Sequence, residues 1–317
     1  RSAQSNYFHN VLCLSEAKGM DIIMKKSTKI MSIVIAGVMS LGLLAGCADE
    51  GNNAGGEGDK GKKIGMVIST LDNPIFVTMK DAAVEKAKEL NYELVVLDSS
   101  NDAAKERSNV EDLVQQGVEV LIINPTDSDA VVNSITVAND AKIPVITVDR
   151  ASNGGEIASH IASDNVAGGE LAGEFLAEQL QGKGKVVELQ GIPGASATNE
   201  RGKGFHNIVD KEEGIEIVAS QTANFDRQEG LNVMENIIQG NDEINGLFAH
   251  NDEMALGALN ALKSAGMEDV VVIGFDGGDD AVTAVNNGEM AATVAQQPDL
   301  MGSLAIENAV KLIKGAQ

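Results

Sequence analysis

Hydrogen-bonding side chains follow almost every short β-branched run of this sequence. They are Ser69, Asn73, Asn124, Asp149 and Arg150 in the first half, and Asn199, Arg201, Asn251, Asp276 and Gln296 in the second, where the aromatic Phe225 also follows a strand. Carboxylates, amides and guanidinium groups can together donate to and accept from hydroxyl groups. The two aspartates balance the two arginines in formal charge, which suits a neutral, hydroxyl-rich ligand better than an anion.

Each of these side chains also has a local explanation. Asn73 would cap a helix whose first position is Pro74, where a missing N–H costs nothing. Asn251 could cap a second helix, and Asp276 with Gly277 could form a turn. Because ligands of parallel sheets bind beyond the carboxyl ends of the strands, and because these polar groups recur at strand after strand, we expect them to line one cleft.

Short β-branched runs alternate with longer amphipathic segments from Lys63 onward. The expected strands are IGMVIS, YELVVLD, VEVLIIN, IPVITVD, KVVELQG, IEIVASQTA, INGLFAHN, VVVIGFDG and MAATVAQQ, and the expected helices are 74–90, 103–116, 129–141, 165–181, 199–213, 226–239, 252–266, 279–287 and 298–314. The alternation predicts parallel sheets with helices on both faces. It restarts after residue 164, so the predicted fold class is α/β with two similar doubly wound parallel-sheet domains.

The composition limits the classes of function. A chain of 317 residues can build two domains with sizeable cores, and 34 Gly with only 3% aromatic residues suits an α/β protein. A formal net charge of −23 leaves little to neutralise phosphates, so we expect no nucleic-acid partner. Cys13 and Cys47 both precede the globular part, so no internal disulfide framework is expected, and neither a metal nor a cofactor is.

The N-terminal part is predicted to be a targeting signal. A basic segment, Met24–Lys29, precedes the apolar run Ile30–Leu44, which has the length of a signal peptide and is too short to span a bilayer. The run leads to Leu44-Ala45-Gly46-Cys47, which resembles the lipobox of bacterial lipoproteins and implies a lipid on the Cys47 sulfur and an anchor in the membrane. A plain signal peptide or an uncleaved anchor is the alternative.

The segments around this signal are also expected to lie outside the fold. Residues 1–19 precede Met20 and are interpreted as an upstream remnant, so residues 1–46 are a remnant plus a lipoprotein signal peptide. Residues 47–62 are rich in Gly, Asn and acidic side chains and are predicted to be a flexible tether.

The stretches STLDNPIF, INPTDSDAV, IPVITVDR, SHIASDN, NERGKGF, NDEMALGAL, GFDG and AQQPD, spread over residues 62–314, resemble the ribose-binding proteins of bacterial ATP-binding-cassette sugar import. The resemblance implies the type I periplasmic-binding-protein fold, with an N-terminal lobe of 63–164 and 298–317, a C-terminal lobe of 165–297, and a multi-strand hinge. It implies an extracytoplasmic protein that closes on a monosaccharide, D-ribose foremost, and presents it to permease subunits or a chemoreceptor.

The resemblance also implies a set of ligand-binding residues. Carried over position by position, they are Ser69, Asn73, Phe76, Asn124, Asp149, Arg150, Ser163, Arg201, Phe225, Asn251, Asp276 and Gln296. Two departures stand out. Ile75 replaces a further Phe of the family, which reduces one aromatic wall, and the sequence stops at Gln317, where the family continues into a third interdomain crossing and a closing strand, so we expect a truncated reading frame.

Three other classes of function compete with this one. An enzyme would be the first, but the turn Ser69–Pro74 has no glycine-rich phosphate loop, and His9, His160, His206 and His250 are scattered. A sugar-responsive repressor would begin with a basic helix-turn-helix instead of a signal peptide. The same scaffold tuned to allose, xylose, galactose or a signalling furanose remains open.

Overall fold

The computed structural model describes residues 62–315 and the backbone of two short upstream strands. In each sheet, the spatial order of the strands differs from their order along the chain. The first sheet runs β1 (Val11–Cys13), β7 (Ser159–Ala162), β6 (Val145–Val148), β5 (Val120–Ile123), β3 (Lys63–Ile68) and β4 (Glu93–Asp98). The second runs β2 (Asp21–Met24), β12 (Ala292–Ala295), β11 (Val271–Asp276), β10 (Gly246–Ala249), β8 (Lys183–Gln190) and β9 (Gly214–Thr222). Among the strands of residues 62–315 every pairing is parallel.

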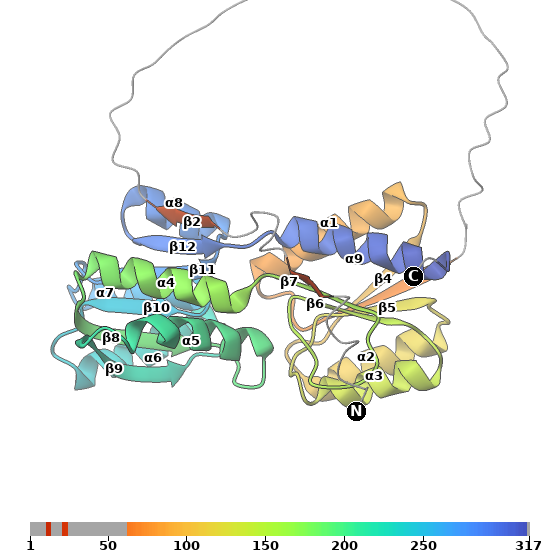
Figure 1. Ribbon diagram of the computed structural model, residues 1–317, viewed down its shortest axis with the longest axis horizontal. Coiled ribbons are helices and arrows are strands. Elements are labelled where there is room, and N and C mark those ends of the chain that lie inside the picture. Colours follow the sequence, from red (N-terminus) through yellow and green to blue (C-terminus); the bar gives the residue numbers. More distant parts are fainter. Residues whose placement is uncertain (1–10, 14–20, 25–61, 316–317) are drawn as a thin grey trace, which may run out of the picture.

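The helices cover both faces of each sheet (Figure 1). They are α1 (Pro74–Glu89), α2 (Ala103–Gln115), α3 (Val131–Asp140), α4 (Asn165–Gln179), α5 (Ser196–Val209), α6 (Arg227–Gly240), α7 (Asp252–Ser264), α8 (Asp279–Asn287) and α9 (Pro298–Ile313). The first sheet with α1, α2, α3 and α9 is called the first lobe below, and the second sheet with α4 to α8 is the second lobe. The predicted fold class is confirmed.

Helix α9 returns the end of the chain to the first lobe. It packs against α1, where Met301, Ala305 and Ile306 join the core that Phe76 and Met79 supply. The two helices approach so closely that a Cβ on Gly302 would collide with the Met79 carbonyl. The chain therefore crosses between the lobes between β7 and α4, and again between β12 and α9, and these crossings position the facing ends of both sheets (Figure 1).

The observed elements differ from the sequence-based expectations in a few places. Helix α5 spans Ser196–Val209 instead of 199–213, because the stretch after Gly194 contains no further helix breaker, so Asn199 lies within the helix and not at its start. The segment 160–164 contributes to β7, which pairs with β6. Most boundaries fall within two residues of the expected ones.

Two strands come from the segment that was expected to lie outside the fold. Strand β1 pairs with β7, and β2 pairs antiparallel with β12. Both β7 and β12 would otherwise be edge strands with free backbone donors and acceptors, which readily accept an additional strand. The rest of the predicted leader, Cys47 and the tether up to residue 61 lie outside the described residues.

Candidate functional site in the cleft between the lobes

Most of the predicted ligand residues line one cavity between the facing ends of the two sheets. Nine of the twelve contribute to its wall, namely Asn73, Phe76, Asp149, Arg150, Arg201, Phe225, Asn251, Asp276 and Gln296. Ile75 and Ala197 complete the wall. The remaining three, Ser69, Asn124 and Ser163, lie behind it and hold residues of the wall.

A buried chain of hydrogen bonds orients Asp149 in the first lobe. Ser69 Oγ donates to Asn124 Oδ1 at 2.6 Å, and Asn124 Nδ2 donates to Asp149 Oδ2 at 3.3 Å and to the Val148 carbonyl at 3.2 Å. These residues lie at the ends of β3, β5 and β6, which are neighbours in the sheet, so each side chain reaches the next. Ser69 and Asn124 therefore orient the Asp149 carboxylate instead of lining the cavity.

Arg150 lies between two aromatic rings. Its guanidinium carbon is 5.2 Å from the ring centroid of Phe76 in the first lobe and 5.2 Å from that of Phe225 in the second. Nη1 donates to the Pro125 carbonyl at 3.2 Å, and Nε lies 3.8 Å from Asp149 Oδ2. Within residues 62–315 Nε has no hydrogen-bond partner, and burial lowers the pKa of Arg150.

Arg201 has more partners than Arg150. Its Nε donates to Asn165 Oδ1 at 2.9 Å and its Nη1 donates to the His250 carbonyl at 2.6 Å. The guanidinium carbon lies 3.8 Å from the ring centroid of Phe275, and Nη1 is 3.7 Å from Asp276 Oδ1. Arg201 is thus fixed by groups of its own lobe on several sides.

Asp276 is linked to the crossings between the lobes. Gln296 Nε2 donates to Asp276 Oδ1 at 2.8 Å, and Ser163 Oγ donates to Gln296 Oε1 at 2.8 Å. Burial raises the pKa of Asp276 to about 7, against the opposing effects of Arg201 and Gln296. Burial, together with the nearby charge of Asp276, also raises the pKa of Asp252 well above its ordinary value.

Asn73 and Asn251 were expected either to cap a helix or to line the cleft, and each does both. Asn73 Oδ1 accepts from the Ile75 N–H at 3.2 Å, and Asn251 Oδ1 accepts from the Met254 N–H at 3.0 Å, so each caps a helix. The Nδ2 of Asn251 also donates to the Phe225 carbonyl at 3.2 Å. Both residues thus cap a helix and line the cavity at the same time.

Three residues of the cavity wall have a positive φ angle although they are not glycine. The values are 64° for Asp149, 61° for Phe225 and 131° for Asp276. A residue held in such a region costs about 1–3 kcal/mol, and such residues gather at sites where function requires a particular side-chain direction. The backbone conformation thus marks the same cleft as the side-chain chemistry does.

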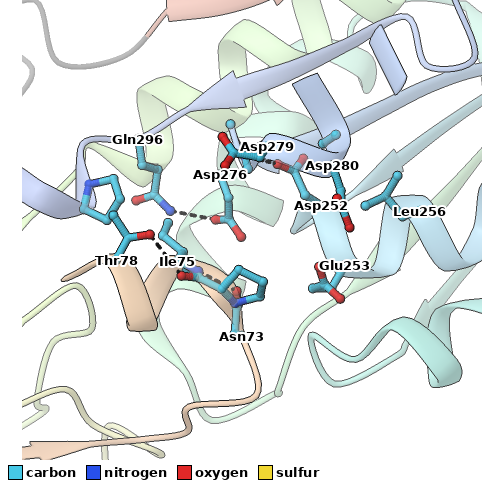
Figure 2. Close-up of a pocket in the computed structure, with 15 residues that line it drawn as sticks. Asn73, Ile75, Thr78, Asp252, Glu253, Leu256, Asp276, Asp279, Asp280 and Gln296 are labelled. Carbon is cyan, nitrogen blue, oxygen red and sulfur yellow. Dashed lines mark hydrogen bonds between the residues drawn. The ribbon is translucent and has the colours of Figure 1, made fainter. Parts of the chain in front are cut away.

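The space enclosed by these side chains is small. It is about 10 Å³, roughly the room that one water molecule needs. A groove of about 380 Å³ adjoins it at the N-termini of α1, α7 and α8, and Figure 2 shows the carboxylates of Asp252, Glu253, Asp279 and Asp280 around this groove. Because Arg150 occupies the slot between the rings, this closed arrangement leaves no room there for a molecule of monosaccharide size.

The two lobes contact each other on another side of the cleft through loops. The Ser128 N–H donates to the Gly194 carbonyl at 2.9 Å, the Ser196 N–H to Ser128 Oγ at 3.2 Å, and the Ala151 N–H to Ser196 Oγ at 2.8 Å. A Cβ at Gly194 would collide with the carboxylate of Asp127. These loop contacts are polar, and a side chain at residue 194 would require the Asp127 carboxylate to move.

Sequence reasoning missed several residues that act on the cavity. Asn165 holds Arg201, but the two are 36 positions apart, and nothing in the sequence links them. His250 was grouped with scattered histidines, although its carbonyl also holds Arg201. Ala197 lines the wall without any polar group, so no chemical signal could have identified it.

Two further observations limit the chemistry. Among the described residues no group of three His, Cys, Asp or Glu side chains is arranged to hold a metal ion. In that same part of the chain, no helix has the length and apolar character that crossing a bilayer requires. The cavity offers paired carboxylates, amides, guanidinium groups and rings, which is a set for holding hydroxyl groups.

A model of the periplasmic binding protein domain matches residues 64–317. The chain belongs to the family of periplasmic binding proteins. A ribose import binding protein of Escherichia coli (strain K12) is 54% identical over 252 residues, which is 80% of this chain and 85% of that protein. A ribose import binding protein of Bacillus subtilis (strain 168) is 47% identical over 291 residues, 90% of this chain and 94% of that protein.

Solved structures of solute-binding proteins have the same fold as this chain. A solute-binding protein of Bacillus halodurans with bound myo-inositol is 34% identical, with a TM-score of 0.78, and the match covers 81% of this chain and 91% of that one. A solute-binding protein of Actinobacillus succinogenes with bound D-allose has the same identity and a TM-score of 0.76, over 81% and 93%. These findings confirm the resemblance, and this periplasmic binding protein is a transport-related binding protein and not an enzyme.

Proposed function

We propose that this protein captures a neutral monosaccharide, D-ribose foremost, in the cleft between its lobes and delivers it to the permease of an ATP-binding-cassette importer. The observation that carries the proposal is the pairing of one Asp–Arg set from each lobe around two phenyl rings. Asp149 with Arg150 and Asp276 with Arg201 leave the cavity without formal excess charge, as a neutral polyol requires. The relatives named as ribose import binding proteins support ribose in particular.

The proposed ligand contacts are the nine residues that line the cavity, with Ser69, Asn124 and Ser163 as supporting residues. A hydroxyl group both donates and accepts, so each sugar hydroxyl needs a carboxylate or amide oxygen beside it and an amide or guanidinium N–H. An unpaired buried polar group costs about 1–3 kcal/mol. A sugar that lacks one hydroxyl would leave such a group unpaired, and the site would reject it by that margin.

Calorimetric titration with a panel of sugars tests the ligand. We expect D-ribose to bind more tightly than xylose, galactose, allose and myo-inositol. Ribose 5-phosphate is the matched control for charge, because five acidic side chains line the groove beside the cavity and repel an anion. Tighter binding of any other sugar of the panel than of ribose would contradict the assignment of ribose and leave the sugar-binding role in place.

Another sugar is the second candidate, and Ile75 favours it. Ile75 lines the cavity and the adjoining groove, and its side chain offers no flat face to a sugar ring. The solved structures that hold myo-inositol and D-allose have the same fold. The titration panel includes both ligands for that reason.

We further propose lobes of 63–164 with 298–317 and of 165–297, with hinges near residues 164 and 297. Contacts from both lobes would favour a closed form when sugar is bound. Small-angle scattering should give a smaller radius of gyration with saturating ribose. A radius that does not change, in protein that binds the sugar by calorimetry, would argue against closure.

The location follows in part from the family, whose members work outside the cytoplasm. We propose in addition that Cys47 carries a lipid that holds the protein at the outer face of the membrane. Cys47→Ser should abolish labelling by a radioactive fatty acid and release the protein into the medium. Labelling that persists in this variant would refute the anchor. A chemoreceptor is the alternative partner to the permease, and co-purification from detergent-solubilised membranes separates the two.

A further inference from the structure

Glu188 is a buried carboxylate that the proposed site does not include. It lies in β8, between β9 and β10, with no exposed surface. It accepts hydrogen bonds from His250 Nε2 at 2.9 Å, Ser220 Oγ at 2.5 Å and Gln190 Nε2 at 3.0 Å, and His206 Nε2 lies 3.5 Å away. A buried carboxylate without such partners would be strongly destabilising, so these donors are needed to keep a charged Glu188 in the interior.

The electrostatics keep Glu188 ionised and His250 neutral. Burial alone would raise the pKa of Glu188, but the hydrogen bonds from His250 and Ser220 and the attraction to protonated His206 lower it below its ordinary value, so Glu188 is ionised at neutral pH. Burial lowers the pKa of His250, and the nearby charges of Arg201 and His206 oppose its protonation, while Glu188 favours it. Within residues 62–315 the Nδ1 of His250 has no partner. A neutral imidazole with its proton on Nε2 satisfies these contacts.

His250 connects this carboxylate to the cavity. Its carbonyl accepts the 2.6 Å hydrogen bond from Arg201 Nη1, and the following residue is Asn251 of the cavity wall. Asn251 in turn caps α7 and donates to the Phe225 carbonyl. The position of the His250 imidazole therefore sets the backbone to which three groups of the cavity wall are attached.

We propose that Glu188 and His250 form a positioning pair, which fixes Arg201, Asn251 and Phe225 for a hydroxyl-bearing ligand without touching that ligand. The role deepens the proposed function and rests on it. A neutral donor–carboxylate contact in the interior is strong and directional, because little water competes with it. The contacts of Glu188 thus offset the cost of its burial, and they hold the residues of the second lobe that line the cavity in fixed positions.

Three variants and a control test the pair. His250→Leu keeps the volume and removes the donor, whereas His250→Gln keeps a donor that reaches Glu188. Glu188→Gln is the second route, in case His250→Leu does not fold, because it keeps the volume and removes the charge of the acceptor. Ile237→Val, in the core of the same lobe and away from the cavity, is the control for a general loss of stability.

Ribose affinity should fall about tenfold or more in His250→Leu and in Glu188→Gln, and by less than about threefold in His250→Gln and Ile237→Val. In a double-mutant cycle, His250→Leu should weaken binding much less in the Arg201→Ala background than in the wild type, because the histidine acts through that arginine. Affinity of His250→Leu equal to that of Ile237→Val, or additive losses in the cycle, would overturn the pair.

An NMR measurement separates this inference from the choice of ligand. The Nη–H signals of Arg201, whose Nη1 donates to the His250 carbonyl, should be sharp and slowly exchanging in wild-type protein and in His250→Gln, and broadened in His250→Leu. A wild-type protein that binds none of the sugars would overturn the proposed ligand, and the Arg201 signal would then decide the positioning pair alone. An unchanged signal in His250→Leu would refute it.

Discussion

Each lobe brings one Asp–Arg pair to the cleft, and the two pairs have nearly the same internal separation. Arg150 Nε lies 3.8 Å from Asp149 Oδ2, and Arg201 Nη1 lies 3.7 Å from Asp276 Oδ1. All four side chains are buried. Neither separation is a close ion pair, so in both lobes the oxygens keep capacity to accept from a ligand.

The surroundings of the two arginines differ. Arg201 has a hydrogen-bonded Nε, a hydrogen-bonded Nη1 and a phenyl ring of its own lobe beneath it. Arg150 has one carbonyl partner and lies between rings that belong to different lobes. Separation of the lobes therefore changes the environment of Arg150 and leaves that of Arg201 intact. The second lobe is the preorganised half of the cleft, and the first lobe contains the group that must adjust.

The most direct way to break this comparison is Arg201→Ala. Removal of a charged partner from a buried site should weaken ribose binding by about 2–4 kcal/mol, or roughly 30- to 800-fold. Calorimetry measures the affinity. The melting temperature without sugar should also fall moderately, because Asn165 Oδ1 and the His250 carbonyl lose their buried donor. A large loss of thermal stability with normal affinity would mean that Arg201 only supports the fold.

Asp276→Asn tests the carboxylate of the same pair through pH. The pKa of Asp276 is raised to about 7, and the ionised form accepts sugar hydroxyls, so affinity should rise as the pH increases through 7 and then level off. The unfolded chain loses this proton near pH 4, so the stability of the free protein should fall as the pH rises from about 4 to 7. Asp276→Asn should bind ribose about tenfold or more weakly, and both pH slopes should flatten.

Wild-type affinity that is constant between pH 5.5 and 8.5 would contradict this coupling. The Asp276→Asn variant is the internal control, since any slope that remains in it comes from other groups. Binding enthalpies measured in two buffers of different ionisation enthalpy would show the released proton directly.

Arg150→Lys tests the arginine of the first lobe. Lysine keeps the charge but loses the flat guanidinium that contacts both Phe76 and Phe225. We expect ribose binding to weaken by about 1–2 kcal/mol, or roughly five- to thirtyfold, which is less than for Arg201→Ala. A loss greater than that of Arg201→Ala, measured by the same titration, would reverse the assignment of the preorganised half.

Ile75→Phe should have the smallest effect. Ile75 lies in the cavity wall of the first lobe, next to Phe76, and a ring there would offer a polarised face to the C–H groups of a sugar. The gain is about 0.5–1.5 kcal/mol, or roughly two- to tenfold tighter ribose binding. Titration of both proteins with ribose and D-allose checks it. Weaker ribose binding in the variant would contradict this role for residue 75.

The sequence allowed the alternating fold and most residues of the cleft to be predicted, because strand ends and polar residues coincide at Asp149, Asn251 and Asp276. It did not distinguish lining residues from supporting ones. Ser69 and Asn124 have the same chemistry as wall residues, and only the sheet order shows that they hold Asp149. In the second lobe, by contrast, Glu188 contacts Ser220 and His250 from neighbouring strands, and contacts between residues so far apart in the sequence leave no local pattern.

The loop contact at Gly194 bears on how long a sugar would stay bound under the proposed function. Ser128 and Gly194 join the lobes through a backbone hydrogen bond that water can replace, and Asp127 occupies the space that a side chain at 194 would need. Under the proposed function, a larger residue at 194 would work against closure of the lobes, because either the Asp127 carboxylate or the loops would have to shift. Under the proposed function, the residence time of the sugar would then depend partly on a residue that does not line the cavity, and the rate of its release could change without any change in which sugar is chosen.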